Sequence, residues 1–388
     1  MQQGRVVIVA GETSGDNLAA GLIRALRARR PGLTFEGIAG PSMVAAGCRA
    51  WDSIERLSVM GLFEVVSHLP RLLAVRRRVL ELAADPPPLA FIGVDYPEFN
   101  LALATRLHER GVPTVQYVSP QVWAWRQGRV RRMTRFLDLV LCLLPFEKRF
   151  YDGAGLAAEF VGHPLADRIP LEPDRWAARA RLGLPAEPTV VALLPGSRRG
   201  EVERLAADFL GAAALIAARR PDVRFVAPMA NPGAREIFER HLKGHPGLDI
   251  LVSDGQSEAA LTAADCVLVA SGTATLETLL CKRPMVVAYR VGRATAAVFR
   301  AFGMMKAPFF AQPNLLAGRR VVPELLQEEV TPARLAAEIL AWLDDPPRAA
   351  AAVEEFRRIH AELRRGASER AAEAVLALLD RRAAGEPG

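Results

Sequence analysis

Hydrophobic residues along the first part of the chain alternate between strand-like runs and patterns with helical spacing. Short apolar runs typical of buried strands occupy residues 5–11, 89–97, 113–120 and 137–145. Apolar side chains recur at helical spacing over residues 17–30 and 101–111. This alternation predicts βα units built on a parallel, doubly wound sheet.

The alternation stops over residues 163–188, which are rich in proline and polar residues and show no strand pattern. We interpret this stretch as a linker. After this stretch the strand-like runs resume at 189–197, 223–229, 248–255, 266–280 and 284–290. The tail at 332–384 has a helical pattern. The sequence therefore predicts two Rossmann-like α/β domains with an interdomain cleft, and ligands bound beyond the carboxyl ends of the strands.

Composition and charge narrow the class of protein. A chain of 388 residues with 51% hydrophobic residues has enough material for two globular cores. The net charge of +7 is compatible with nucleic acid, anionic lipid or phosphorylated small molecules. No zinc-finger spacing and no basic platform interleaved with aromatic residues is present, so we expect no nucleic-acid partner.

The cysteines and the hydrophobic segments indicate the cellular compartment in which the protein is expected. The four cysteines are far apart and form no CxxC pair, and Cys142 and Cys266 lie in apolar runs that predict buried thiols. We therefore expect a reducing compartment and no metal site. There is neither a signal-peptide pattern nor an apolar stretch of the ~20 residues that span a bilayer, so we predict a cytoplasmic protein.

Two strand-to-helix turns in the second half are candidates for binding phosphate. In "LLPGSRRGEVE", Gly196 and Ser197 lie where a strand ends, and Arg198 and Arg199 follow. Free backbone N–H groups, the helix dipole and guanidinium groups all favour an anion there. The alternative is an ordinary βα turn with solvated arginines, and the combination of features favours phosphate. No Walker spacing is present.

The second of these turns, "ASGTATLE", adds Ser271, Gly272 and Thr273, with Glu277 four residues after Thr273. Thr273 and Glu277 can share one side of a helix, where the carboxylate can accept hydrogen bonds from a ribose diol. The alternative is helix capping with a solvent-exposed glutamate, which is nearly as well supported by this stretch alone.

Acidic residues dominate the corresponding turns of the first half. "GETSGD" places Glu12 and Asp16 in a glycine turn, where they would repel a diphosphate but can accept hydrogen bonds from sugar hydroxyls. "IGVDYPEFN" places Asp95 at the end of a strand, followed by Glu98. A carboxylate in this position can act as a general base, although acids in such turns more commonly cap helices.

Three further features leave alternatives open. Trp123 and Trp125 can line a pocket, Ser119 lacks the Gly-x-Ser-x-Gly elbow of serine hydrolases, and His163 suits either the reacting centre or a structural role. Residues 59–83 carry more apolar side chains than one stripe of a solvated helix needs, with Arg71 and Arg76–Arg78 close to them. Such a surface suits an interfacial contact with anionic lipid, and the common alternative is core packing with a basic solvent face.

Eight ordered motifs distributed over nearly the whole chain resemble the lipid-A-disaccharide synthase family. They are "AGETSGD", "GIAGPSM", "MGLFEV", "YVSPQVWAWR", "LPFEKRFYD", "LLPGSRRGEVE", "ASGTATLE" and "PNLLAGRRVVPELLQEE". The family consists of inverting glycosyltransferases, family 19, with the two-domain GT-B fold. It transfers 2,3-diacylglucosamine from its UDP carrier to 2,3-diacylglucosamine 1-phosphate (lipid X), forming the β-1′,6-linked lipid A disaccharide 1-phosphate and UDP.

The resemblance implies roles for residues of this chain. Asp95 would be the catalytic base, and Glu12 and Ser14 would lie on the acceptor side. The UDP and diphosphate side would consist of Ser197, Arg198, Ser271, Gly272, Thr273, Glu277 and Asn314. Where the family pattern leads us to expect Asp, this chain has Glu98, to which we assign no catalytic role.

The resemblance also implies the setting of the reaction. It implies no cofactor and no bound metal, because helix N-termini and arginines would stabilise the leaving diphosphate. Both substrates carry acyl chains, so the protein would dock peripherally on the cytoplasmic leaflet of the inner membrane as a monomer or homodimer. The expected docking residues are Phe63, Val66, Leu69, Leu72 and Leu73.

The resemblance also implies where the domains begin and end. Residues 1–170 would form the acceptor and membrane-side domain and residues 171–350 the UDP-sugar domain, with residues 351–388 packing back on an N-terminal domain. A nucleotide-sugar epimerase or a peptidoglycan-type glycosyltransferase is the nearest alternative, and a non-catalytic basic binding protein is the alternative from another class. Acyl-chain length and the parts played by His163 and Glu12 stay open.

Overall fold

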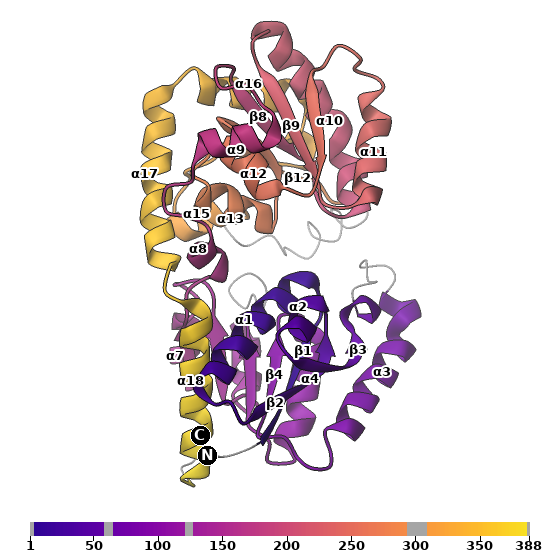
Figure 1. Ribbon diagram of the computed structural model, residues 1–388, viewed down its shortest axis with the longest axis vertical. Coiled ribbons are helices and arrows are strands. Elements are labelled where there is room, and N and C mark those ends of the chain that lie inside the picture. Colours follow the sequence, from indigo (N-terminus) through magenta and orange to yellow (C-terminus); the bar gives the residue numbers. More distant parts are fainter. Residues whose placement is uncertain (1–3, 58–64, 121–126, 293–308, 386–388) are drawn as a thin grey trace. The chain divides into compact units, whose positions relative to one another are not determined.

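The computed structural model describes residues 4–57, 65–120, 127–292 and 309–385 of the chain (Figure 1). These residues form two compact units. Unit 1 comprises Met1–Asp167 together with Leu363–Gly388, and unit 2 comprises Arg168–Glu362. Each unit contains one sheet whose strand pairs are all parallel.

Unit 1 has a seven-stranded sheet in the order β3-β2-β1-β4-β5-β6-β7. Its strands are β1 (Gly4–Ala10), β2 (Leu33–Ala39), β3 (Cys48–Ser53), β4 (Ala90–Val94), β5 (Thr114–Tyr117), β6 (Leu139–Cys142) and β7 (Ala158–Phe160). Its helices are α1 (Thr13–Arg29), α2 (Pro41–Ala45), α3 (Val65–Leu82), α4 (Pro97–His108), α6 (Val130–Met133), α7 (Arg149–Asp152) and α18 (Ala367–Ala383), and α8 (Pro164–Arg168) ends at the boundary with unit 2.

Unit 2 has a six-stranded sheet in the order β10-β9-β8-β11-β12-β13. Its strands are β8 (Val190–Leu194), β9 (Arg224–Met229), β10 (Ile250–Asp254), β11 (Cys266–Ala270), β12 (Met285–Tyr289) and β13 (Glu324–Leu326). Its helices are α9 (Arg175–Leu182), α10 (Arg199–Arg219), α11 (Pro232–Leu242), α12 (Ser257–Ala263), α13 (Thr273–Leu280), α15 (Gln312–Ala317), α16 (Pro332–Leu343) and α17 (Pro346–Leu363).

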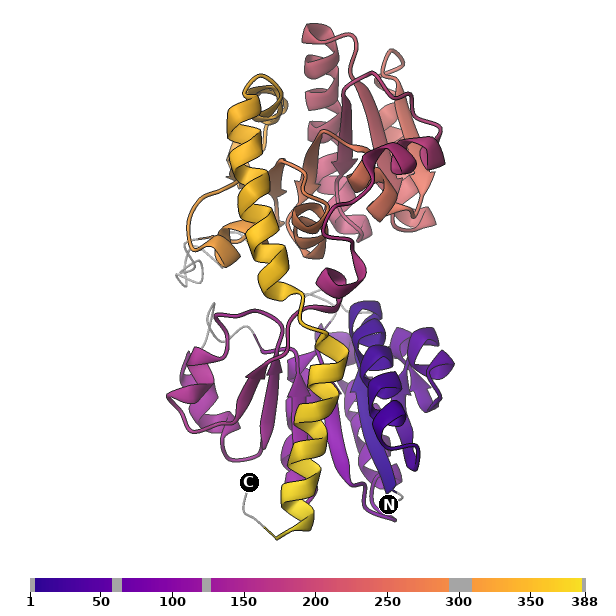
Figure 2. The same ribbon diagram turned by 60° about the vertical axis from the view of Figure 1, so that its left-hand side comes forward.

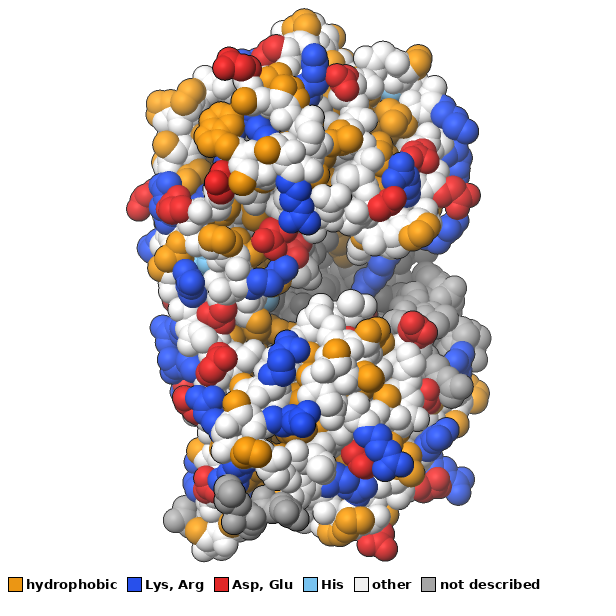
Figure 3. Space-filling model, viewed as in Figure 1, with side chains coloured by type: hydrophobic (Ala, Val, Ile, Leu, Met, Phe, Trp, Pro, Cys, Tyr) orange, Lys and Arg blue, Asp and Glu red, His pale blue; other side chains and the backbone are white. Residues whose placement is uncertain are grey.

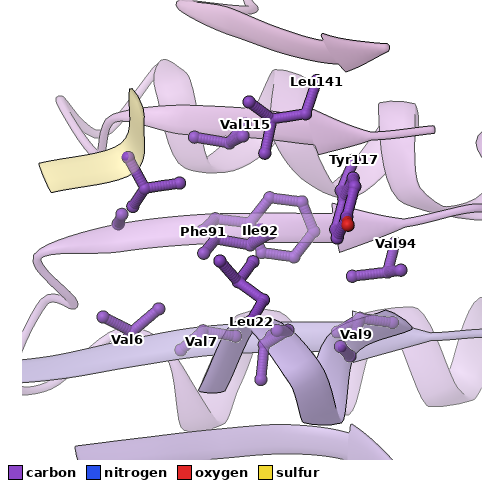
Figure 4. Close-up of a cluster of buried hydrophobic side chains, with 14 of the residues drawn as sticks. Val6, Val7, Val9, Leu22, Phe91, Ile92, Val94, Val115, Tyr117 and Leu141 are labelled. Carbon is purple, nitrogen blue, oxygen red and sulfur yellow. The ribbon is translucent and has the colours of Figure 1, made fainter. Parts of the chain in front are cut away.

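The core of unit 1 lies on its central strands. Valine, isoleucine and phenylalanine side chains of β1, β4 and β5 are fully buried, and Leu22 of α1 packs among them (Figure 4). Strands buried on both faces need continuous apolar runs, which is the pattern in the sequence. After α17 the chain returns to unit 1, where α18 packs beside α1 (Figure 2).

The prediction of two parallel α/β domains is confirmed, and all four cysteines are buried and free, as expected for Cys142 and Cys266. The sequence pattern did not indicate β2, β3, β7 and β13. The 163–188 linker contains α8 and α9, with Arg179 of α9 buried against Asp265 at 2.7 Å. This stretch is therefore a packed part of unit 2 for most of its length.

Candidate active site

The sheet of each unit has one point at which the strand order reverses, and the candidate residues follow the strands at that point. In unit 1 the reversal lies between β1 and β4, and in unit 2 between β8 and β11. Open parallel sheets bind ligands outside the carboxyl ends of the strands at such points. Glu12 and Ser14 follow β1 and Asp95 follows β4, while the two predicted phosphate turns follow β8 and β11.

The glycines of the β1–α1 turn serve a close approach between neighbouring turns. A Cβ added at Gly11 would lie 2.5 Å from Cβ of Tyr96, so no side chain fits there. A Cβ at Gly15 would lie 3.3 Å from the Val94 carbonyl oxygen and 3.7 Å from Cβ of Asp95. The start of α1 therefore lies directly against the β4–α4 turn, and the glycines have a packing role that does not require phosphate.

Asp16 does not have the role that the sequence indicated. Its side chain is 1% exposed and accepts hydrogen bonds from the backbone N–H groups of Gly40, Ser42 and Met43 at 2.9, 2.9 and 3.0 Å. All three donors lie at the start of α2, so the carboxylate fixes the beginning of that helix. The expectation that it accepts from sugar hydroxyls is wrong for Asp16, because both of its oxygens are already engaged inside the protein.

The two acceptor-side candidates lie at the start of α1. Glu12 is the N-cap residue and is half-buried, and Ser14 is exposed in the first turn. Both are close to the turn that carries Asp95, because a Cβ on the neighbouring Gly15 would lie 3.7 Å from Cβ of Asp95.

Asp95 stands at the end of β4 in a left-handed backbone conformation with a φ of 54°. It is half-buried, and its backbone N–H donates to the Tyr117 carbonyl at 2.8 Å. Burial raises the pKa of the Asp95 carboxyl; the Tyr96 backbone N–H opposes this effect, and the negative charge of Glu12 adds to it. A carboxyl whose pKa is moved toward the working pH is better suited to accepting a proton from a hydroxyl.

Other polar residues that the sequence singled out in unit 1 have internal partners. The exposed Glu98 accepts from Arg129 at 2.8 Å, and the Ser119 hydroxyl lies 2.7 Å from the Tyr151 hydroxyl. His163 is buried, and its Nδ1 accepts from the Leu165 N–H at 3.2 Å. Burial lowers the pKa of His163 to about 4, so its ring is neutral at pH 7. Trp123 and Trp125 lie outside the described residues.

The turn after β8 holds Ser197 and Arg198 exposed at the start of α10. The sequence predicted free N–H groups here, but the N–H groups of both residues donate to the Glu201 carboxylate, at 3.2 and 3.3 Å. Gly196 has a φ of 131°, and a Cβ on it would lie 2.6 Å from Cβ of Glu201. An anion using these N–H groups must therefore displace Glu201, whereas the Arg198 side chain is 70% exposed.

The turn after β11 brings hydroxyl and carboxylate groups together. Ser271 is half-buried and donates to the Phe310 carbonyl at 3.4 Å, and Gly272 and Thr273 are exposed at the start of α13. Gly272 has a φ of 149°, which favours glycine. Glu277 lies one helical turn after Thr273, and burial raises the pKa of its carboxyl while the charge of Arg168 opposes that rise.

Asn314 lies inside unit 2, away from the surface. It is fully buried; its Nδ2 donates to the Val322 carbonyl and to Glu324, both at 2.9 Å, and its Oδ1 accepts from the N–H groups of Val321 and Val322 at 2.6 and 2.9 Å. Glu324 in turn accepts from the N–H groups of Phe310 and Ala311. Asn314 therefore supports the segment that contacts Ser271.

The expected docking helix α3 has both a core face and an exposed face. Val75 and Val79 are buried, Leu72 is half-buried against the core, and Leu73 is 49% exposed. Phe63 lies outside the described residues, as do the side chains of Val66 and Leu69. Within the described part of the chain, no helix combines the length and apolar character needed to cross a membrane. Basic and acidic side chains are interspersed on the surface that Figure 3 shows.

Several positioning residues are not evident from the sequence. Asn100 and Gln116 hold the Asp95 turn, Glu201 occupies the turn after β8, and Glu324 orders the segment beside Ser271. An amide within the buried run "TVQY" was the available signal for Gln116, because a polar side chain there needs partners. Glu201 lies within a motif that we quoted, but sequence spacing does not indicate a bond back to the turn.

Solved structures with the same architecture define the class. A kitacinnamycin glycosyltransferase has a TM-score of 0.63 at 20% identity, covering 98% of this chain and 100% of its own. A UDP-GlcNAc 2-epimerase from Neisseria meningitidis has a TM-score of 0.63 at 12% identity, with coverages of 96% and 99%. This likeness concerns the fold, which is that of GT-B glycosyltransferases and related epimerases.

Sequence comparison identifies the family within that class. Residues 6–378 match the model of the family described as lipid-A-disaccharide synthetase. The chain is 52% identical over 378 residues to a lipid-A-disaccharide synthase from Pseudomonas aeruginosa, covering 97% of this chain and 99% of the relative, and 48% identical over 373 residues to one from Serratia proteamaculans, with coverages of 96% and 97%. The chain belongs to the lipid-A-disaccharide synthase family.

Proposed function

We propose that this protein transfers 2,3-diacylglucosamine from UDP-2,3-diacylglucosamine to the 6-hydroxyl of 2,3-diacylglucosamine 1-phosphate. The products are the β-1′,6-linked lipid A disaccharide 1-phosphate and UDP. The observation that carries this proposal is the match to relatives of that name at 52% identity over 97% of the chain. The candidate residues at both strand-order reversals support it.

In this mechanism Asp95 is the general base. It takes the proton of the acceptor 6-hydroxyl as that oxygen attacks C1 of the donor sugar, and the bond between C1 and the UDP oxygen breaks with inversion. Burial raises the pKa of Asp95, which strengthens it as a proton acceptor, and general bases contribute about 10²- to 10⁴-fold to rate. Glu12 and Ser14, at the start of α1, would contact the acceptor sugar.

The UDP group belongs on unit 2 in this proposal. Arg198 would stabilise the charge that develops on the leaving diphosphate, and the N-terminus of α10 would do so once the diphosphate has displaced Glu201 from its N–H groups. Ser197, Ser271, Gly272 and Thr273 would donate to the diphosphate, and the half-buried carboxylate of Glu277 would accept from the ribose hydroxyls. Asn314 would act indirectly, by holding the segment that receives the Ser271 hydrogen bond.

Incubation of the purified protein with both substrates, followed by mass spectrometry, tests the activity. We expect the disaccharide 1-phosphate and UDP from the wild-type chain, and a loss of at least about 10²-fold in rate from Asp95→Asn with UDP binding retained. Glu98→Gln is the matched control, because this acid lies three residues away and is engaged by Arg129. Absence of disaccharide would overturn the proposal, and conversion of UDP-GlcNAc instead would indicate an epimerase.

Membrane docking through α3 follows from the acylated substrates. We propose that the exposed face of α3, which includes Leu73, contacts the cytoplasmic leaflet of the inner membrane. Phe63, Val66 and Leu69 remain predicted docking residues outside the described side chains, and Leu72 packs partly against the core. Leu73→Ser tests this in sedimentation with vesicles containing anionic lipid, because Leu73 is 49% exposed. Leu215→Ser in α10 is the matched control, at 44% exposed. Equal vesicle binding by both variants would refute the docking surface. Monomer or homodimer stays our prediction.

A further inference from the structure

Three non-glycine residues with positive φ cluster where β4 and β5 end. Asp95 and Tyr96 have φ values of 54° and 41°, and Val118 has a φ of 77°. Val94 pairs with Tyr117 in the sheet, so the turns after the two strands are neighbours. Positive φ is unfavourable for residues with a Cβ, above all for β-branched valine. Such a conformation persists only where the surroundings hold it in place.

Asn100 of α4 is one of the groups that hold this turn. Its side chain is fully buried, and its Nδ2 lies 2.8 Å from the Asp95 carbonyl oxygen and 3.3 Å from those of Val94 and Val9. Gly93 makes room for it, because a Cβ at Gly93 would lie 2.7 Å from Cβ of Asn100. The glycine two residues before the acid and the asparagine five residues after it thus form one packed unit.

Gln116 of β5 approaches the same carbonyl from the adjacent strand. It is 1% exposed, and its Nε2 lies 3.2 Å from the Asp95 carbonyl oxygen, 3.2 Å from that of Val118 and 3.4 Å from that of Tyr117. The two buried amides therefore converge on the Asp95 carbonyl, whose two lone pairs can accept both. Gln116 also links the strained turn after β4 to the one after β5.

Fixing this carbonyl fixes the side chain on the same residue. With its carbonyl held by α4 and β5, Asp95 places its Cβ against the start of α1, where a Cβ on Gly15 would lie 3.7 Å away. A different φ at Asp95 would turn the carboxylate away from α1. The amide pair thus determines where the carboxylate stands at the β1–β4 reversal.

We propose that Asn100 and Gln116 are positioning residues that hold the Asp95 backbone in its left-handed conformation and so aim its carboxylate at the acceptor hydroxyl. This inference rests on the proposed role of Asp95 as the base. It concerns residues that touch no substrate, so its test needs a readout that follows the geometry of Asp95 and not merely stability.

A double-mutant cycle provides that readout. Gln116→Met keeps the size of the side chain and removes its donors, and Asn100→Leu is the more severe companion. We expect Gln116→Met to lower kcat at least tenfold with little change in the KM for the UDP-sugar, and to add almost nothing in the Asp95→Asn background. Release of Asp95 toward solvent should also move the acid limb of the kcat profile to lower pH, because burial is what raises the pKa of Asp95.

Thr114→Val is the matched control. Thr114 is a fully buried polar residue at the other end of β5, where its hydroxyl donates to the Phe136 carbonyl. It should lower stability while leaving kcat and its pH profile unchanged at a temperature where the protein is folded. A Gln116→Met loss of equal size in the wild-type and Asp95→Asn backgrounds, or an unmoved acid limb, would overturn the positioning inference alone. Full turnover by Asp95→Asn would overturn the base assignment and the inference with it.

Discussion

Replacement of Asp16 distinguishes a carboxylate that holds the fold from one that binds a substrate. Its Oδ1 accepts from the N–H groups of Gly40 and Met43, and its Oδ2 accepts from that of Ser42. Asp16→Ala removes all three acceptors from the start of α2. Asp16→Asn keeps one oxygen but turns an NH₂ group toward an N–H donor.

These contacts determine how much free energy of unfolding the Asp16 variants should lose. Gly40 and Met43 are buried, and each buried N–H left without an acceptor costs about 1–3 kcal/mol. The five-residue helix α2 has little stability of its own to compensate. We therefore expect Asp16→Ala to cost about 3 kcal/mol, which lowers the melting temperature of a unit of this size by about 6–12 °C. Asp16→Asn should cost about 1–2 kcal/mol, because one oxygen keeps its donors.

Thermal unfolding and hydrogen exchange of the α2 segment measure this loss, and the acceptor KM is measured well below the transition. We expect lower stability, faster exchange around residues 40–46 and an unchanged acceptor KM. Asn17→Ala is the control, since Asn17 is an exposed neighbour whose side chain accepts from the Ser42 hydroxyl and not from the backbone N–H groups that Asp16 holds. A raised acceptor KM with wild-type stability would refute this reasoning and return Asp16 to the acceptor site.

Three further predictions concern buried ionisable groups. Because burial lowers the pKa of His163 to about 4, the unfolded chain binds a proton at this histidine more tightly than the folded chain does. The free energy of unfolding of unit 1 should therefore fall by on the order of 3 kcal/mol between pH 6.5 and pH 4. Denaturant titrations should show a weaker dependence of stability on pH in His163→Gln. Burial lowers the pKa of Lys282 to about 8, so unit 2 should gain stability from pH 8 to 10.5, and a slope that persists in Lys282→Met would contradict this. Arg179→Met should destabilise unit 2 by about 3 kcal/mol in urea unfolding, because it removes a buried partner of Asp265; a loss below about 1 kcal/mol would show that the ion pair of Asp265 with Arg175 suffices.

Three of the four edge strands, β3, β7 and β13, were missed, as was β2, whereas the edge strand β10 and the other inner strands were predicted. β1, β4, β8 and β11 are continuous apolar runs because both faces of a central strand are covered. β3, "CRAWDS", lies at a sheet edge with two exposed residues and carries charges that weaken its strand pattern. β7 and β13 have three residues each, which is too short for a period to be recognised.

The candidate site also has features that the sequence predicted and features that it did not. Strand-to-helix turns with suitable residue types were evident in the sequence, and Asp95, Arg198 and Glu277 do follow strands at the reversals of strand order. Spacing does not reveal which polar groups are already engaged inside the protein. Asp16 and Asn314 were assigned ligand contacts, although their hydrogen-bonding groups have internal partners.

The sequence by itself determined the two α/β units, the family and the turns that carry chemistry, because apolar periodicity, strand ends and ordered motifs are local properties of the chain. Only the tertiary structure decided which turns are neighbours, since the order of strands depends on pairing between distant segments. It also decided that the glycines of "GETSGD" admit the Asp95 turn, and that Asn100 and Gln116 hold it. Burial and hydrogen-bond partners arise only when those segments pack, and they separate a carboxylate that supports the fold from one that is available for catalysis.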